Sequence, residues 1–124
     1  ETVEIYRRFV VIHHELIPYM LSAGTIAYET NTSIMKPVAP FSREIPKIWD
    51  YFFWKDIFVS TITEEGLKVK EIQLPAGNNW VDWWNGTLYR GGTNISYPLS
   101  IQTFPVFKRG KALFVFMFTM QLDR

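Results

Sequence analysis

The chain has 124 residues, of which 48% are hydrophobic and 17% aromatic, so it can bury the core of one domain and is not a disordered segment. Its net charge is only +1 and its basic residues do not cluster, which gives no electrostatic reason to expect nucleic acid or acidic lipid as a partner. The absence of cysteine excludes disulfide bonds and thiolate chemistry.

The first thirty residues predict helices. Pro18 interrupts the helical pattern, so it either kinks one helix or lies in the first turn of a second. His13 and His14 point about 100° apart on a helix and cannot share a metal ion as residues four apart could. Asn31-Thr32-Ser33 ends this part with residues typical of turns. Apolar residues at steps of four and three define one face of the first helix: Ile5, Phe9, Ile12 and Leu16.

Two short elements are expected next. The segment from Ile34 to Val38 predicts a short strand, and Pro37 argues against a central position in a sheet. A short helix is expected from Ser42 or Arg43 through Trp49 to Phe53, with Pro46 near its first turn.

From Asp56 onwards the pattern has a period of two, which is typical of strands. The apolar phase slips between Val69 and Ile72, which predicts a bulge or a strand covered on both faces. The longest apolar run, Ala112 to Met120, predicts a core strand and is far shorter than the roughly 20 residues of a membrane span. The expected strands occupy residues 57–62, 67–74, 80–84, 93–97, 103–107 and 112–122, and the last includes Phe114, Phe116 and Phe118.

Turn signals separate these strands. Glu64-Glu65-Gly66 predicts a solvated turn, and Gly91-Gly92 predicts another. Asn85-Gly86 predicts a two-residue hairpin, because both of its central residues need a positive φ angle. Helices followed by an antiparallel meander indicate an α+β fold, or parts of two adjacent domains.

The segment from Leu74-Pro75-Ala76-Gly77 through Trp80-Val81-Asp82-Trp83 to Tyr89-Arg90-Gly91-Gly92 resembles a β-sandwich segment of glycoside hydrolase family 31. This family contains α-glucosidases, α-xylosidases and sulfoquinovosidases. Leu16-Ile17-Pro18-Tyr19 and Ile34-Met35-Lys36-Pro37 resemble its last barrel helix and last barrel strand. The resemblance implies that residues 1–55 end a (β/α)8 barrel catalytic domain and that residues 56–124 form an antiparallel β-sandwich.

Three departures from the family pattern suggest a divergent branch. Where the family usually reads Gly-x-x-Leu-Leu-Val-Ala-Pro-Val, this chain has residues 54–62, which begin with Trp54 and lack both the Gly and the Pro. Lys36 replaces the usual Arg, and the loop from Gly77 to Trp80 is one residue longer than is common.

The resemblance implies a parent enzyme that hydrolyses α-glycosidic bonds with retention, without metal or cofactor. Its two catalytic Asp residues would lie on barrel strands upstream, and no residue here matches either motif. We therefore expect no catalytic, cofactor-binding or metal-binding residue in this chain. Asp50 and Asp56 are expected to form caps or salt bridges, and Asp82 to support the hairpin. Glu64 and Glu65 belong to the solvated turn.

Trp80, Trp83 and Trp84 leave two readings open. Alternate aromatic residues can fill a sandwich core and its seam with a barrel, or exposed indole rings can stack on sugars. The alternatives to an enzyme fragment are a non-catalytic carbohydrate-binding or protein-interaction module, and a degenerate piece without a ligand. For the fragment, substrate would meet the missing barrel, and the helical face of Ile5 and Phe9 would pack on that barrel or self-associate.

Overall fold

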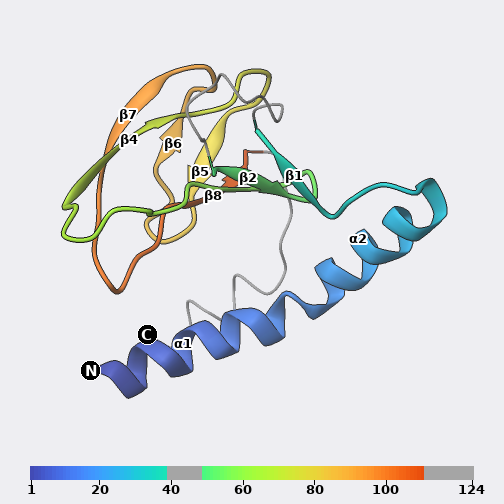
Figure 1. Ribbon diagram of the computed structural model, residues 1–124, viewed down its shortest axis with the longest axis horizontal. Helices are drawn as coiled ribbons and strands as arrows, with labels where there is room; N and C mark the ends of the chain where they lie inside the picture. Colours follow the sequence, from blue (N-terminus) through green and yellow to red (C-terminus); the bar gives the residue numbers. More distant parts are fainter. Residues whose placement is uncertain (39–48, 111–124) are drawn as a thin grey trace. The chain divides into compact units, whose positions relative to one another are not determined.

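The structure, a computed structural model, describes residues 1–38 and 49–110 (Figure 1). The chain divides into two compact units. The first contains Glu1–Ile34 and is helical in its described part, and the second is Met35–Ala112, which holds the described strands.

The helical unit consists of α1, Thr2–Glu15, and α2, Ile17–Thr30. Pro18 lies in the first turn of α2, where its missing N–H costs nothing, so the second of the two predicted alternatives is confirmed. Asn31 ends α2 in the left-handed conformation with a φ of 53°, and the Thr32 N–H donates to the Ala27 carbonyl at 3.0 Å. The predicted turn after the helices is thus confirmed.

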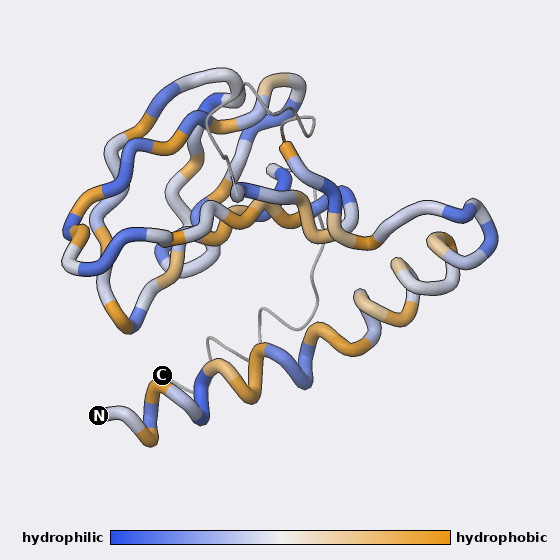
Figure 2. The backbone as a smooth tube through the Cα atoms, in the orientation of Figure 1, coloured by the Kyte–Doolittle hydropathy of each residue, from blue (hydrophilic) through white to orange (hydrophobic). Residues whose placement is uncertain are grey.

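The strand unit is antiparallel throughout its described part, in agreement with the predicted α+β class. A six-stranded sheet has the order β1-β2-β3-β8-β5-β6, and a two-stranded sheet pairs β4 with β7. Figure 2 shows both hydrophobic and hydrophilic segments along β4 and β7. The strands are β1 Met35–Pro37, β2 Tyr51–Phe53, β3 Ile57–Val59, β4 Val69–Gln73, β5 Trp80–Asp82, β6 Leu88–Tyr89, β7 Asn94–Pro98 and β8 Val106–Arg109.

The core of this unit combines residues from both sheets. Phe58 on β3 and Phe107 on β8 stack with their ring centroids 6.0 Å apart, and Trp80 on β5 lies 5.8 Å from Phe58. Ile72 on β4 and Tyr97 on β7 complete the cluster from the small sheet. Two sheets with their apolar faces joined are the architecture of a β-sandwich.

The end of the predicted short helix is wrong. Residues 51–53 form strand β2, which pairs with β1 on one side and with β3 on the other. Tyr51, Phe52 and Phe53 favour strands, and a ladder on both sides outweighs the weak helical signal of the preceding residues. The beginning of that helix, with Ser42, Arg43 and Pro46, lies outside the described residues, as does the predicted strand 112–122 with Phe114, Phe116 and Phe118.

The predicted bulge near Val69 is also wrong, because the register of β4 with β7 runs unbroken from Val69–Pro98 to Gln73–Asn94. Ile72 is buried and Val69 is exposed, so the strand has one buried face. The inward position two residues before Ile72 is held by Lys70, which explains the gap in the apolar pattern.

The two-residue hairpin at Asn85-Gly86 is wrong as well. Gly86 has a φ of 74°, but Asn85 does not have a positive φ. The Asp82 N–H donates to Thr87 O at 2.9 Å, so the loop between the paired residues comprises positions 83–86. The Asp82 carboxylate accepts hydrogen bonds from backbone N–H groups of this loop, which favours the longer turn.

β1 lies at the edge of the six-stranded sheet, where Pro37 is tolerated as predicted. It runs antiparallel to β2, so within the described chain it lacks the parallel pairing of a barrel strand. The sheet therefore includes residues on both sides of position 55. The assignment of residues 1–55 to a catalytic barrel and of 56–124 to a sandwich stays a prediction.

Candidate functional site

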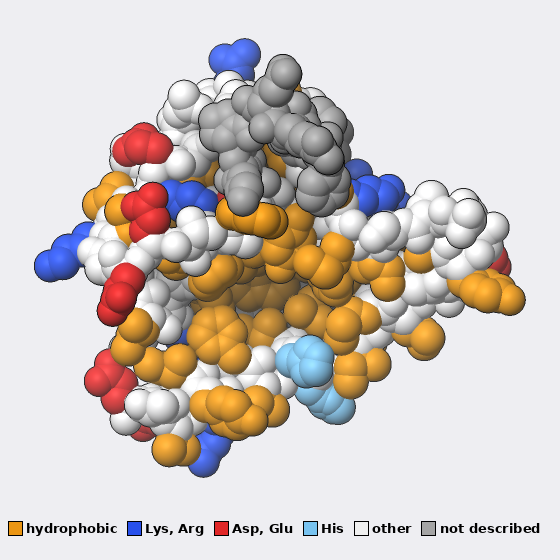
Figure 3. Space-filling model, in the orientation of Figure 1, with side chains coloured by type: hydrophobic (Ala, Val, Ile, Leu, Met, Phe, Trp, Pro, Cys, Tyr) orange, Lys and Arg blue, Asp and Glu red, His pale blue; other side chains and the backbone are white. Residues whose placement is uncertain are grey.

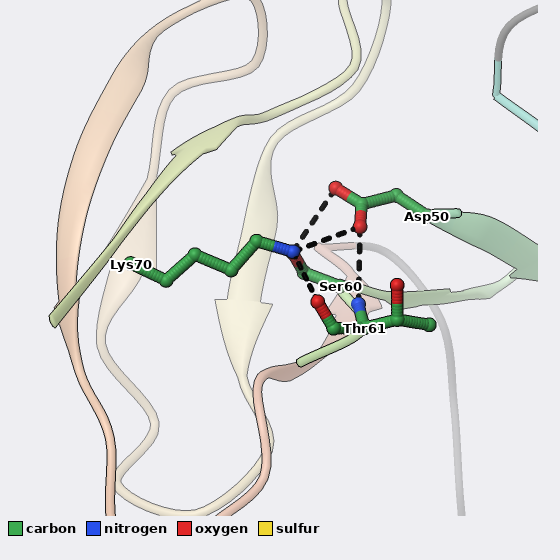
Figure 4. Close-up of polar contacts among 4 residues, drawn as sticks. All are labelled: Asp50, Ser60, Thr61 and Lys70. Carbon is green, nitrogen blue, oxygen red and sulfur yellow. Dashed lines mark hydrogen bonds and ion pairs between the residues drawn. The ribbon is translucent and has the colours of Figure 1, made fainter. Parts of the chain in front are cut away.

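Asp50 is the centre of a polar cluster that ties the two sheets together (Figure 4). Its Oδ1 accepts hydrogen bonds from the Thr61 N–H at 3.0 Å and from Lys70 Nζ at 3.1 Å. Its Oδ2 accepts from Ser60 Oγ at 3.0 Å, and Lys70 Nζ also donates to the Thr61 carbonyl. Lys70 belongs to β4, whereas Ser60 follows β3, so this cluster stabilises the sandwich.

Asp56 forms the second ionic contact. Its Oδ1 lies 2.6 Å from Arg109 Nη2, and its carbonyl accepts the Arg109 N–H at 2.7 Å. Both bonds fasten the turn between β2 and β3 to the end of β8. The predicted structural roles of Asp50 and Asp56 in salt bridges are confirmed.

Trp54 begins that same turn with a φ of 58°, which is a strained conformation for a bulky side chain. In the resemblance described above this position corresponds to the glycine that the chain lacks, and glycine adopts such a φ angle without strain. The neighbouring Lys55 places Nζ 4.9 Å from the centroid of the Trp54 ring, a cation–π contact.

Asp82 is fully buried at the end of β5. Its Oδ1 accepts hydrogen bonds from the Trp84 N–H at 2.7 Å and from the Asn85 N–H at 3.2 Å, which closes the loop and confirms the predicted support of the hairpin. Burial chiefly, and then Asp82, raise the pKa of Tyr97 well above its ordinary value.

The surroundings of Asp50, Asp56 and Asp82 differ from those that a catalytic carboxyl group needs. A retaining glycosidase needs a nucleophilic carboxylate and an acid/base carboxyl group about 5–5.5 Å apart, both able to reach the substrate. Asp50, Asp56 and Asp82 are each held by protein donors, and Asp82 has no exposed surface. Within residues 1–38 and 49–110, no three His, Asp or Glu side chains come together to hold a metal ion. His13 and His14 are exposed on α1.

The three tryptophans have different environments. Trp80 is 1% exposed and Trp83 is 5% exposed, and the Trp80 Nε1 donates to the Pro75 carbonyl at 2.9 Å. Trp84 is half-buried, and its Nε1 donates to the Phe104 carbonyl at 2.6 Å. These positions favour the packing reading for Trp80 and Trp83. Sugar stacking by any of the three stays a prediction.

An open groove of about 450 Å³, which the sequence pattern does not predict, lies beside the segment from Leu74 to Gly92 that resembles the family. Its lining includes Asn78, Asn79, Leu88, Arg90 and Arg109. The backbone at Gly91 lies so close to the backbone at Asn78 that a side chain at position 91 would not fit. A Cβ there would lie 1.8 Å from the Asn78 carbonyl oxygen. The groove offers hydrogen-bond donors but no acidic side chain among its lining residues.

No helix in the described part of the chain is long and apolar enough to cross a membrane.

Comparisons with known proteins extend this picture. The Glycosyl hydrolase family 31 C-terminal domain matches residues 31–114. An alpha-xylosidase of Saccharolobus solfataricus is 27% identical over 114 residues, which are 89% of this chain and 16% of that protein. The sulfoquinovosidase of Escherichia coli is 26% identical over 122 residues, which are 95% of this chain and 18% of that protein. The chain thus spans less than a fifth of either relative.

Solved structures agree. A dextranase of this family from Flavobacterium johnsoniae, complexed with glucose, superposes with a TM-score of 0.77 at 26% identity, over 90% of this chain and 14% of that one. A cycloalternan-forming enzyme from Listeria monocytogenes, in complex with a pentasaccharide substrate, gives 0.75 at 32% identity, over 89% and 11%. Together with the match over residues 31–114, these likenesses show that the chain belongs to glycosyl hydrolase family 31, in the region of its C-terminal domain.

Proposed function

We propose that this chain is the C-terminal segment of a retaining α-glycosidase and that it serves as a scaffold for a catalytic barrel formed by the upstream polypeptide. The family match over residues 31–114 carries the proposal, because the relatives named above act on glycosides and are several times longer than this chain. On this proposal, α1 and α2 come from the end of the barrel and residues 56–124 form the adjoining sandwich domain.

The environments of the acidic residues support a scaffold role. In a retaining enzyme one carboxylate attacks the anomeric carbon to form a covalent glycosyl-enzyme, while a second carboxyl group donates a proton to the leaving oxygen. Asp50 and Asp56 are committed to Lys70 and Arg109, and Asp82 is committed to backbone N–H groups. On this proposal the catalytic carboxyl groups come from outside this chain.

Hydrolysis of chromogenic α-glucosides, α-xylosides and α-sulfoquinovosides tests the proposal. The 124-residue chain should give no turnover, and the longer polypeptide that includes the upstream region should hydrolyse at least one of these substrates. Turnover by the 124-residue chain that disappears in Asp50→Asn, Asp56→Asn or Asp82→Asn would contradict the scaffold role.

A second candidate function is a non-catalytic carbohydrate-binding module. The open groove with Asn78, Asn79 and Arg90 favours it, because sugar sites present hydrogen-bonding side chains. Half-buried Trp84 is a separate aromatic candidate, since it is not among the lining residues of the groove. Retarded migration of the 124-residue chain in gels containing soluble α-glucans would support this candidate. Unchanged migration in all of them would count against it.

A further inference from the structure

Helices α1 and α2 carry two apolar faces, of which one was predicted from the sequence. The predicted face continues from Ile12 on α1 to Tyr19 and Ala23 on α2, and these three side chains are buried. Six other large apolar side chains are between 46% and 91% exposed, and we call them the outer stripe: Val3, Tyr6, Val10, Ile17, Leu21 and Tyr28.

The spacing of the outer stripe shows that it is one continuous face on each helix. Its members follow one another at steps of three, four or seven residues, which align side chains along a helix. The predicted face is offset from it, since Ile12 and Val10, or Tyr19 and Leu21, are two positions apart and point in different directions. A helix that is apolar on two sides is usually covered on both sides in the complete protein.

The surroundings of the outer stripe suit a closely packed protein partner. Figure 3 shows the His side chains beside hydrophobic side chains, and His13 and His14 lie between Val10 and Ile17 in the sequence. Gly24 falls between Leu21 and Tyr28 at the same helical spacing, and a Cβ there would meet only Ile34 Cδ1 at 3.9 Å. The missing side chain leaves a shallow place where a partner can approach the backbone.

We infer that the outer stripe is the docking surface for an apolar face of the upstream part of the same polypeptide. This inference rests on the proposed function, which makes the chain the end of a longer enzyme. Two observations favour that occupant over a second copy of this chain. The family's C-terminal domain match begins at residue 31, so both helices precede it. The chain also covers only 16% of the length of the alpha-xylosidase, which leaves ample polypeptide to cover the stripe.

Thiol labelling tests the inference cleanly, because the chain contains no cysteine. Leu21→Cys places one thiol in the outer stripe. Ser22→Cys is the matched control, since Ser22 is exposed, adjacent and nearly the same size as cysteine, but points away from the stripe. Both variants are prepared in the 124-residue chain and in the longer polypeptide, and the rate of reaction with a maleimide is measured in each.

We expect similar rates for the two thiols in the 124-residue chain. In the longer polypeptide the Leu21→Cys thiol should react about tenfold more slowly or slower still, while the Ser22→Cys thiol stays reactive. Equal rates in the folded longer polypeptide would overturn the inference. Protection of Leu21→Cys in the 124-residue chain that grows with protein concentration would identify a second copy as the occupant and would also overturn it.

Hydrolysis by the same samples separates this inference from the proposed function. A longer polypeptide that hydrolyses α-glycosides but leaves the Leu21→Cys thiol fully reactive overturns only the docking surface. A longer polypeptide that protects the thiol but hydrolyses no α-glycoside overturns the proposed function. The outer stripe would then still be a docking surface for the upstream polypeptide, but in a protein that is not an α-glycosidase.

Discussion

Lys70 Nζ lies 3.1 Å from Asp50 Oδ1, an ion pair between residues twenty positions apart whose side chains are only 21% and 13% exposed. The pair joins β4 of the small sheet to the segment that precedes β2 of the large sheet. Lys70 therefore occupies an inward strand position without leaving a buried charge unpaired. The sandwich uses this position for a specific polar link between its sheets.

Loss of that link should destabilise the sandwich. Lys70→Met keeps an unbranched side chain but leaves the Asp50 carboxylate without its cation, and we expect a loss of about 2 kcal/mol in the free energy of unfolding. Urea unfolding followed by tryptophan fluorescence measures it. Lys68→Met, at an exposed position of the same segment, is the control and should change stability by less than about 0.5 kcal/mol. Equal midpoints for the two variants would contradict the assigned role of the pair.

Asp82→Ala should be more harmful. The change removes the acceptor for the Trp84 and Asn85 N–H groups and leaves a small void at a fully buried site, for an expected loss of about 3 kcal/mol. Asn85→Ala removes only the exposed hydrogen bond of the Asn85 side chain to the Thr87 N–H and should cost about 1 kcal/mol or less. Urea unfolding compares the free energies of unfolding of the two variants. An Asp82→Ala variant as stable as Asn85→Ala would contradict the role of the buried Asp82 carboxylate in holding the loop.

The arrangement of helices first and strands afterwards could be predicted from the sequence, because hydrophobic periodicity and turn residues report it directly. Pro18 and Pro37 were informative for the same reason, since proline excludes helix interiors and central strands. Strand β2 was missed because its three residues are aromatic and too few to show a period.

Side-chain partners distant in the sequence explain the other failures. The partner of Lys70 is Asp50, twenty residues earlier in the chain, and the residues next to Lys70 do not indicate it. The inward lysine was therefore interpreted as a break in the apolar pattern. The longer loop after β5 depends on hydrogen bonds to Asp82, which a dipeptide rule for Asn85-Gly86 does not contain. The groove and the outer stripe depend on which surfaces remain uncovered after folding, and periodicity does not report that.

Gly91→Ala should disrupt the turn between β6 and β7. A Cβ at Gly91 would lie 1.8 Å from the Asn78 carbonyl oxygen and 2.8 Å from the Pro75 carbonyl oxygen, so the backbone of the loop between β4 and β5 must move. We expect a loss of about 3 kcal/mol or more. Gly66→Ala is the comparison: it has open space but a φ of 75°, and should lose only about 1 kcal/mol. Thermal melting of both variants orders the two costs, and a milder effect at Gly91 would contradict the close approach.

The tryptophans can be separated by their effects on stability and on sugar binding. Trp80→Ala and Trp83→Ala remove buried rings and should each cost about 3–5 kcal/mol, whereas Trp84→Ala should cost less because its ring is half-buried. Melting curves and gel migration in α-glucans are measured on each variant. A Trp83→Ala variant that melts like the parent chain yet loses affinity for a glycan would favour the binding-module function over the scaffold.

Tyr97 should make the sandwich sensitive to alkaline pH. Burial and the neighbouring Asp82 raise the pKa of its hydroxyl in the folded state above the ordinary value of 10.0. The stabilisation is therefore fully present below pH 10 and is lost above it, because the unfolded chain releases the Tyr97 proton while the folded protein must retain it. Each pH unit above that point should remove up to about 1.4 kcal/mol through this group.

Tyr97→Phe isolates this contribution. At neutral pH the variant should lose about 1 kcal/mol because the Asp82 carboxylate no longer interacts with the hydroxyl. Between about pH 9 and about pH 11 its stability should fall less steeply than that of the parent chain, so the two curves converge. Tyr6→Phe, on the exposed side of α1, controls for the loss of a tyrosine hydroxyl and should follow the parent curve. Parallel curves for Tyr97→Phe and the parent chain would show that Tyr97 ionises equally easily in the folded and unfolded states.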